Sequence, residues 1–213
     1  MANPVTLISR YEVTGSEGEY QPGSNDTVLA NKVGITDPND MNIAETELLE
    51  DLYEYVFNNF PDQLEWSLLC EWHRKWLGNL YDWAGRLRTV DMSKPDIRFA
   101  SPLQIDKLAK QFSAEYLDRF DQLPDMADDD LIAFLAEVHV EFILIHPFRE
   151  GNGRLSRLLL DVLAVKAGLQ PLDYTLWDEH KDFYFKAVQA GRDGDYQYVE
   201  RLVRDVAESQ QDD

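Results

Sequence analysis

Reactive side chains are concentrated in one polar stretch near the middle of the 213-residue chain. The stretch is His146-Pro147-Phe148-Arg149-Glu150-Gly151-Asn152-Gly153-Arg154, and a further arginine follows at Arg157. Apolar residues recur with helical spacing on both sides of it, so we expect a loop that joins two helices. Such a density of polar groups between two core helices favours a ligand with phosphate groups.

The Gly151-Asn152-Gly153 segment has the composition of an anion site. Glycines allow a backbone to approach a ligand closely, and a helix that starts at this point directs free N–H groups and its dipole at one anion. Arg154 and Arg157 are three residues apart, so they share one helix face and can both fork onto phosphate oxygens.

Two further residues fit reactive roles beside such an anion. His146 has an ordinary pKa near 6.5 and can take a proton from an attacking hydroxyl. Glu150 is suited to Mg²⁺, which characteristically uses one or two carboxylates together with substrate phosphates. Each residue alone also fits a structural role, such as a helix cap, a tight turn or a solvated charge. Their occurrence together predicts transfer of a phosphate-containing group from a nucleotide.

The elements that must position this loop are helical. Apolar periodicity predicts helices from Met41 to Phe60, Leu64 to Tyr81, Ser101 to Phe120, Leu131 to His146, Gly153 to Gly168, Asp178 to Ala190 and Asp195 to Ala207. Two alternating runs within 88–99 flank a Ser-Lys-Pro-Asp turn and predict a β-hairpin, the one strand-like element of the sequence. The fold class is therefore all-α, a helical bundle with one small hairpin.

Three segments follow from this pattern. Residues 1–40 are rich in Gly, Ser, Asn, Asp and Pro, and we expect an irregular extension with one short helix near 27–33. Residues 41–207 form the helical domain, and residues 208–213 form a frayed tail.

Composition restricts the partners and the compartment. A net charge of −20 repels phosphate backbones and argues against direct nucleic-acid binding. Cys70 is the single cysteine, which excludes a disulfide framework and a Cys-rich zinc site. The sequence shows neither a signal peptide nor an apolar run long enough to span a membrane, so the expectation is a cytoplasmic protein without a membrane partner.

The sequence HPFREGNGRLSR resembles the signature of the Fic (Fido) domain family, H-P-F-x-[D/E]-G-N-G-R-x-x-R, at every fixed position. Upstream, LYDWAGRLRT, the hairpin and RFASP are similar to the family's helix, flap and following helix. YQPGSNDTVLANKVGI resembles the family's N-terminal extension. The resemblance covers roughly residues 20–206 and implies a Fic-type helical bundle with a β-hairpin flap.

The resemblance implies adenylylation, in which AMP passes from ATP to a Ser, Thr or Tyr hydroxyl of a target protein. It implies that His146 is the general base and that Glu150 holds Mg²⁺. It also implies that the α- and β-phosphates are cradled by Gly151, Asn152 and Gly153, and that Arg154 contacts the outer phosphates. Arg157 would do the same or order the site, and Phe148 would anchor the loop. The flap would align the target by strand addition, with Met92 or Ile97 as a clamp, although both residues equally suit covering of the helical body.

Gly153 bears on the type of reaction. A branch of the superfamily that resembles the toxin Doc has Lys at this position and phosphorylates its target, so Gly153 favours nucleotidyl transfer. Transfer of another group, phosphoryl or phosphocholine, and a catalytically silent nucleotide-binding or interaction module remain alternatives.

Many family members carry an inhibitory helix with the pattern [S/T]-x-x-x-E-[G/N]. Thr46–Glu50 and Thr175–Glu179 have its spacing but are followed by Asp51 and His180, and we interpret both as ordinary helical segments. Inhibition, where it occurs, is therefore expected from a separate small antitoxin-like protein or from another mechanism.

Overall fold

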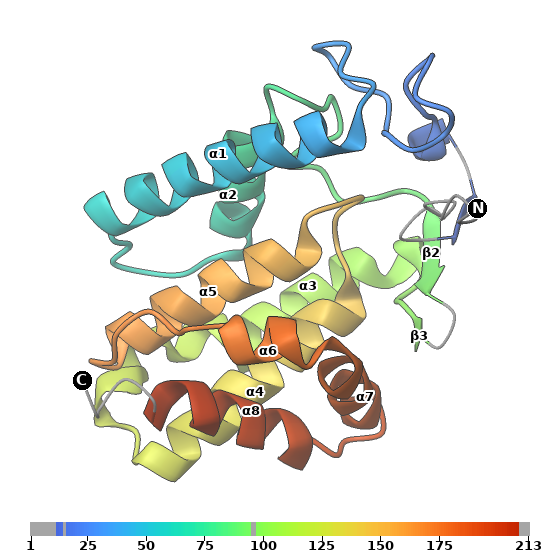
Figure 1. Cartoon of the computed structure of the whole chain (residues 1–213). Helices are drawn as coiled ribbons and strands as arrows, with labels where there is room; N and C mark the ends of the chain where they lie inside the picture. Colours follow the sequence, from blue (N-terminus) through green and yellow to red (C-terminus); the bar gives the residue numbers. More distant parts are fainter. Residues whose placement is uncertain (1–11, 15, 95–96, 209–213) are drawn as a thin grey trace.

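A central helix organises the computed structural model, which describes residues 12–14, 16–94 and 97–208. This helix, α4 (Asp128–Ile145), is apolar on nearly every side and packs against α3 (Pro102–Glu115), α5 (Asn152–Lys166), α7 (Lys181–Gly191) and α8 (Gln197–Glu208). A helix that is apolar all round needs partners on all sides. Figure 1 shows α4 enclosed by the lower half of the bundle.

A second layer crosses the top of the bundle and consists of α1 (Pro38–Asn58) and α2 (Trp66–Leu77). Asp37 caps α1, because its carboxylate accepts hydrogen bonds from the N–H groups of Asn39 and Asp40. Short segments complete the helical part: η1 (Ser16–Gly18), η2 (Leu117–Asp125) and α6 (Thr175–Glu179). A helix is found at each predicted stretch, but three of them differ in extent from the prediction. The helix expected over 64–81 ends at Leu77, and the one expected over 101–120 ends at Glu115 and continues as η2. The one expected over 178–190 is divided at His180 between α6 and α7 (Lys181–Gly191), because the backbone of His180 is not helical.

The expected short helix near 27–33 is wrong. The Asn31 side chain binds the local backbone instead: its Oδ1 accepts from Ile35 N–H, and its Nδ2 donates to the carbonyls of Leu29 and Ile35. Such side-chain bonds compete with the helical ladder and hold the chain in turns. The first long helix begins at Pro38, and residues 209–213 of the expected frayed tail lie outside the described residues.

The predicted hairpin exists as β2 (Asp91–Lys94) and β3 (Ile97–Arg98), while Pro95 and Asp96 of its turn lie outside the described residues. A strand that the sequence did not predict, β1 (Glu12–Thr14), pairs antiparallel with β2 and gives a sheet of order β1-β2-β3. The register places Val13 opposite Met92 and Ser93 opposite Arg98. Figure 1 shows this sheet at the side of the bundle, where the loop between α4 and α5 also lies.

None of the helices in the described ranges is both long enough and apolar enough to cross a membrane.

Candidate functional site

The polar loop between α4 and α5 starts at His146, which has a left-handed backbone conformation with φ 49°. Its N–H still donates to Phe142 O, so it is the last residue bonded to α4, and Pro147 cannot continue the helix. The imidazole Nδ1 lies 3.1 Å from Ile143 O. Because a carbonyl only accepts, Nδ1 carries the proton and Nε2 carries the basic lone pair.

His146 occupies an apolar and positively charged environment. Its side chain is 3% exposed, and its ring stacks on Phe99 with 3.7 Å between the centroids. Burial is the main cause that lowers its pKa well below 6.5, and the nearby charges of Arg88, Lys94 and Arg149 lower it further. His146 is therefore a neutral imidazole at pH 7, the form that a general base requires.

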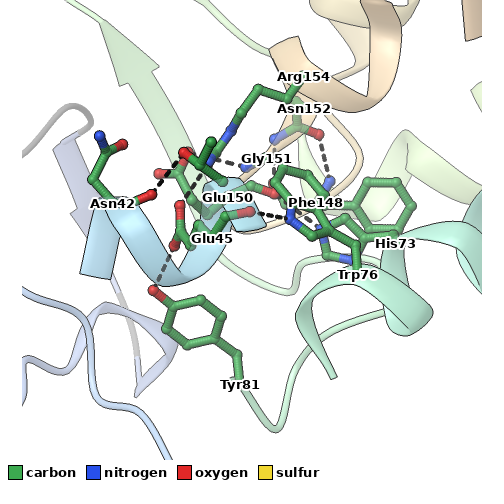
Figure 2. Close-up of polar contacts among 11 residues, drawn as sticks. Asn42, Glu45, His73, Trp76, Tyr81, Phe148, Glu150, Gly151, Asn152 and Arg154 are labelled. Atoms are coloured by element: carbon green, nitrogen blue, oxygen red, sulfur yellow. Dashed lines mark hydrogen bonds and ion pairs between the residues drawn. The ribbon is translucent and has the colours of Figure 1, made fainter. Parts of the chain in front are cut away.

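The loop is held by two buried side chains that turn inward (Figure 2). Asn152 Oδ1 accepts from Phe148 N–H at 2.9 Å, and Asn152 Nδ2 donates to Phe148 O at 2.8 Å. The Phe148 ring stacks on His73 with 4.0 Å between the centroids. His73 in turn accepts from Gly85 N–H and donates to Glu150 O, so α2 and the segment after it hold the loop in place. The Asn152 side chain thus shapes the loop and leaves its backbone N–H for a ligand.

The N-terminus of α5 lies where the sequence predicts an anion site. The first backbone bond of this helix runs from Leu155 N–H to Gly151 O, so the N–H groups of Asn152, Gly153 and Arg154 lie before the first helical bond. Gly151 has φ +81°, and a Cβ there would lie 2.6 Å from the Trp76 ring. No atom lies within 4 Å of a Cβ built on Gly153. Gly151 is therefore required by the fold, whereas Gly153 leaves open space directly above the helix N-terminus.

Arg154 lies between two carboxylates (Figure 2). Its Nη2 is 2.6 Å from Glu45 Oε2 and 3.8 Å from Glu150 Oε1. Its guanidinium also lies over the Trp76 ring at 4.5 Å. Glu150 Oε1 accepts from Gly151 N–H at 3.0 Å, which keeps that carboxylate at the mouth of the loop.

Arg157, one turn later on α5, is held by α6. Both of its terminal nitrogens bind Asp178, at 2.9 and 3.0 Å, and the guanidinium lies over the Tyr174 ring at 4.9 Å. A two-point arginine–carboxylate pair fixes orientation as well as distance. Of the two predicted roles of Arg157, this geometry favours the ordering of the site, and both roles stay predictions.

Met92 and Ile97 of the flap are buried, at 3% and 5% exposure, in a small cluster with Val90 and Phe99. Ile97 also lines a cavity of about 260 Å³ between the flap and α7, together with Leu144, Gln189, Arg192 and Asp193. Contact of Met92 or Ile97 with a target therefore stays a prediction.

Sequence reasoning missed two residues of this region, and both carried a signal. Glu45 is buried on the face of α1 that carries Met41, Leu52 and Val56, so an acidic residue on an apolar stripe was the indication. Arg88 has the same parity as Val90 and Met92, which places it on the buried face of the hairpin run. Its guanidinium donates to the carbonyls of His146, Val90, Ala100 and Ile145.

The donor set restricts the kind of metal that fits. Within the described ranges no three His, Cys, Asp or Glu side chains are arranged to hold a metal ion. A zinc-type site made by the protein alone would need such a cluster. The single carboxylate of Glu150 beside an anion site fits Mg²⁺ that is completed by substrate phosphates.

Comparison with curated proteins gives relatives of known name. The chain is 31% identical over 155 residues to the probable protein adenylyltransferase y4lH of Sinorhizobium fredii, covering 70% of this chain and 76% of the relative. It is 30% identical over 159 residues to the protein adenylyltransferase VbhT of Bartonella schoenbuchensis, and 34% identical over 100 residues to the probable protein adenylyltransferase Fic of Salmonella typhimurium. These matches cover 68% and 47% of this chain, but only 32% of VbhT and 50% of the Salmonella protein.

Solved structures share the fold. The N-terminal Fic domain of a Bartonella effector protein from Bartonella sp. AR 15-3 superposes with a TM-score of 0.77 at 22% identity, covering 89% of this chain and 91% of that chain. BepC from Bartonella tribocorum, with bound AMPPNP, superposes with a TM-score of 0.70 at 24% identity, covering 84% and 92%. The sequence model of the Fic/DOC family matches residues 63–164, which include α2, the flap, α4 and the whole polar loop. Together with the relative from Sinorhizobium fredii, this match shows that the chain belongs to the Fic/DOC family.

Proposed function

We propose that the chain is a protein adenylyltransferase, which moves AMP from ATP to a Ser, Thr or Tyr hydroxyl of a target protein. The observation that carries the proposal is the meeting of a neutral base, His146, with an anion site at the N-terminus of α5 inside one loop. The names of the relatives support the reaction type, and the AMPPNP bound to BepC supports a nucleotide as the donor.

The reaction is a displacement at the α-phosphorus. His146 Nε2 takes the proton of the acceptor hydroxyl as its oxygen forms a bond to the α-phosphorus, and the bond from that phosphorus to the bridging oxygen breaks. Pyrophosphate leaves with the electron pair. The N–H groups of Asn152, Gly153 and Arg154 and the dipole of α5 offset the negative charge on the α- and β-phosphates. Arg154 binds the outer phosphates, and Arg157 orders the α5–α6 side of the site through Asp178.

Glu150 would hold Mg²⁺ at this site, and the cation would offset charge on the phosphates. The support is the position of Glu150, which lies one residue before the anion site and accepts from Gly151 N–H.

The flap would align the target by strand addition, and Met92 or Ile97 would contact it. Support for Ile97 comes from the cavity between the flap and α7, which this side chain lines. A separate small antitoxin-like inhibitor is retained as a proposal, because Glu50 and Glu179, the two glutamates with inhibitory spacing, are exposed.

Incubation with isotopically labelled ATP, Mg²⁺ and a cell lysate tests the reaction, with peptide mass spectrometry as the measurement. The expected result is the mass of an adenylyl group on Ser, Thr or Tyr of a target. A phosphoryl adduct would indicate phosphoryl transfer in place of adenylyl transfer, and no adduct would contradict the enzyme assignment.

In the Glu150→Gln variant we expect the Mg²⁺ concentration at half-maximal rate to rise about tenfold or more, since the metal loses its protein carboxylate. An unchanged Mg²⁺ titration would contradict the role of Glu150.

The two glycines of the loop are expected to respond differently to alanine. Gly151→Ala should lower the free energy of unfolding by about 2–4 kcal/mol, because φ +81° and the Trp76 ring both oppose a Cβ. Gly153→Ala should leave it unchanged or raise it by up to about 1 kcal/mol, yet weaken nucleotide binding where the phosphates approach the backbone. Denaturant unfolding and calorimetric titration measure the two effects. Equal destabilisation by both variants would contradict this assignment.

A further inference from the structure

Glu45 is an acidic side chain in the apolar interface between α1, α2 and α5, where it is 6% exposed. Both carboxylate oxygens are engaged, since Oε1 accepts from Tyr81 OH at 2.7 Å and Oε2 accepts from Arg154 Nη2 at 2.6 Å. Its backbone carbonyl accepts from Trp76 Nε1 at 2.8 Å. A buried carboxylate is costly unless its partners are in place, and both oxygens of Glu45 have theirs. Figure 2 shows that the contacts from Tyr81, Trp76 and Arg154 all meet at Glu45.

The position of Tyr81 and Trp76 makes this arrangement rigid. Burial, and then the charge of Glu45, raise the pKa of Tyr81 far above its ordinary value, so the phenol stays protonated and donates to the carboxylate. Trp76 fixes the backbone of Glu45 with its indole N–H and lies under the guanidinium of Arg154 with its ring. The direction of the Arg154 side chain is therefore set by residues outside the polar loop.

The carboxylates on the two sides of Arg154 compete for it. Glu45 is in direct contact at 2.6 Å, whereas Glu150 is at 3.8 Å and lies four residues before Arg154 in the sequence. If Glu45 carried no charge, Glu150 would be the nearer anionic partner in the described site. A direct pair with Arg154 would then offset the charge through which Glu150 attracts a cation.

We propose that Glu45 is a positioning residue that holds Arg154 away from Glu150, so that the arginine stays aimed at the outer phosphates and the Glu150 carboxylate keeps its strength as a ligand for Mg²⁺. This inference rests on the proposed nucleotide and Mg²⁺ site. A residue of α1, outside the polar loop, would thus control how strongly nucleotide binding depends on Mg²⁺.

Glu45→Gln tests the inference, because the amide keeps the size of the side chain and can still bond to Arg154 and Tyr81 without the charge. Calorimetric titration with α,β-methylene-ATP, whose α–β bridge cannot be cleaved, measures binding at a series of Mg²⁺ concentrations. We expect the Mg²⁺ concentration for half-maximal binding to rise about tenfold. A neutral partner holds Arg154 about half as strongly as a carboxylate, so the arginine would pair with Glu150 and offset the charge that attracts Mg²⁺. Glu47→Gln, on the exposed side of the same helix, is the matched control and should leave it unchanged.

The same substitution made in Arg154→Ala protein separates a positioning role of Glu45 from a purely structural one. In Arg154→Ala protein, Glu45→Gln should cause no further shift in Mg²⁺ dependence, because the arginine that it positions is gone. Tyr81→Phe, which removes one anchor of Glu45, should give a smaller shift than Glu45→Gln. Thermal unfolding of each variant verifies that it is folded.

Any of the following results would overturn the inference. Lower stability of Glu45→Gln with unchanged Mg²⁺ dependence would reduce Glu45 to a packing role. Tighter binding of the analogue by Glu45→Gln would make the Glu45–Arg154 pair an inhibitory contact. Failure of the wild-type protein to bind the analogue at any Mg²⁺ concentration would refute the nucleotide site and the inference together, whereas binding without Glu45 dependence would refute the inference alone.

Discussion

Replacing His146 by asparagine is expected to lower the rate of the proposed AMP transfer by about 10²–10⁴-fold, the usual contribution of a positioned general base. Asparagine is the suitable substitute because it tolerates the left-handed conformation that His146 adopts at φ 49°. It carries no basic nitrogen, so the acceptor hydroxyl would lose its proton acceptor. Steady-state kinetics on an identified target, with nucleotide binding measured in parallel, should show a loss of rate with retained affinity.

His180→Ala is the matched control, since His180 is exposed beyond the end of α6 and takes no part in the loop. That variant should transfer AMP at the wild-type rate. Transfer by His146→Asn within a factor of three of wild type would exclude His146 as the base.

The pH dependence of the wild-type enzyme gives a second measure of the same assignment. Burial lowers the pKa of His146 well below 6.5, so the neutral, basic form persists as the pH falls through 6.5. The value of kcat/KM reports groups of the free enzyme, and its profile should therefore show no half-point at 6.5 on the acidic side. A loss of half the activity at pH 6.5 would mean that the imidazole titrates as in water, contrary to its burial beside Phe99.

Replacing Arg88 by methionine is expected to lower the free energy of unfolding by about 3 kcal/mol or more, because a buried acceptor left without its donor costs about 1–3 kcal/mol. The Arg88 side chain is 2% exposed and donates to four carbonyls, two at the C-terminal end of α4 and two at the base of the flap. Burial lowers its pKa only to about 10, so it remains charged at pH 7 and also complements the negative end of the α4 dipole. Urea unfolding followed by circular dichroism measures the change.

Arg86→Met, two residues away, is the control, because Arg86 is exposed and its side chain donates to the single exposed-loop carbonyl of Asp82 in the described structure. Its effect should stay within about 0.5 kcal/mol. Arg88→Lys should lie between the two, since a lysine keeps the charge but cannot span four separated carbonyls. A loss below about 1 kcal/mol in Arg88→Met would mean that those carbonyls find other donors.

The residues of the candidate site in the loop could be identified from sequence because they are contiguous. The order His146, Glu150, Gly151, Gly153, Arg154 is compressed into nine positions, and the periodic apolar segments on each side define the two helices that present it. Local signals also predicted β2 and β3, because alternation and turn residues lie within one short window. The chemistry of the loop therefore required no knowledge of distant contacts.

The supports of the loop depend on contacts between distant segments and were harder to predict. Glu45 and Arg154 are separated by 109 positions, and Arg88 and His146 by 58. The stripe on α1 shows that Glu45 turns inward, but not which cation it meets. The pairing of β1 with β2 likewise joins residues 12–14 to 91–93, and three residues of strand leave too weak a pattern to predict a partner. The turn at Asn31 was missed because its apolar neighbours suggested a helix.

The pairing of β1 with β2 affects how a target reaches the flap. The strand order leaves β2 with β1 on one side and β3 on the other. Shortly after β1, the Glu17 carboxylate accepts from Thr89 N–H and Oγ, and its carbonyl accepts from Arg149 Nε. An acceptor peptide that pairs with β2 must therefore exchange with a strand of the same chain, whose effective concentration is on the order of millimolar for a short tether. Free peptides would compete poorly with it, and an acceptor segment already fixed in an extended shape on a folded protein would compete well.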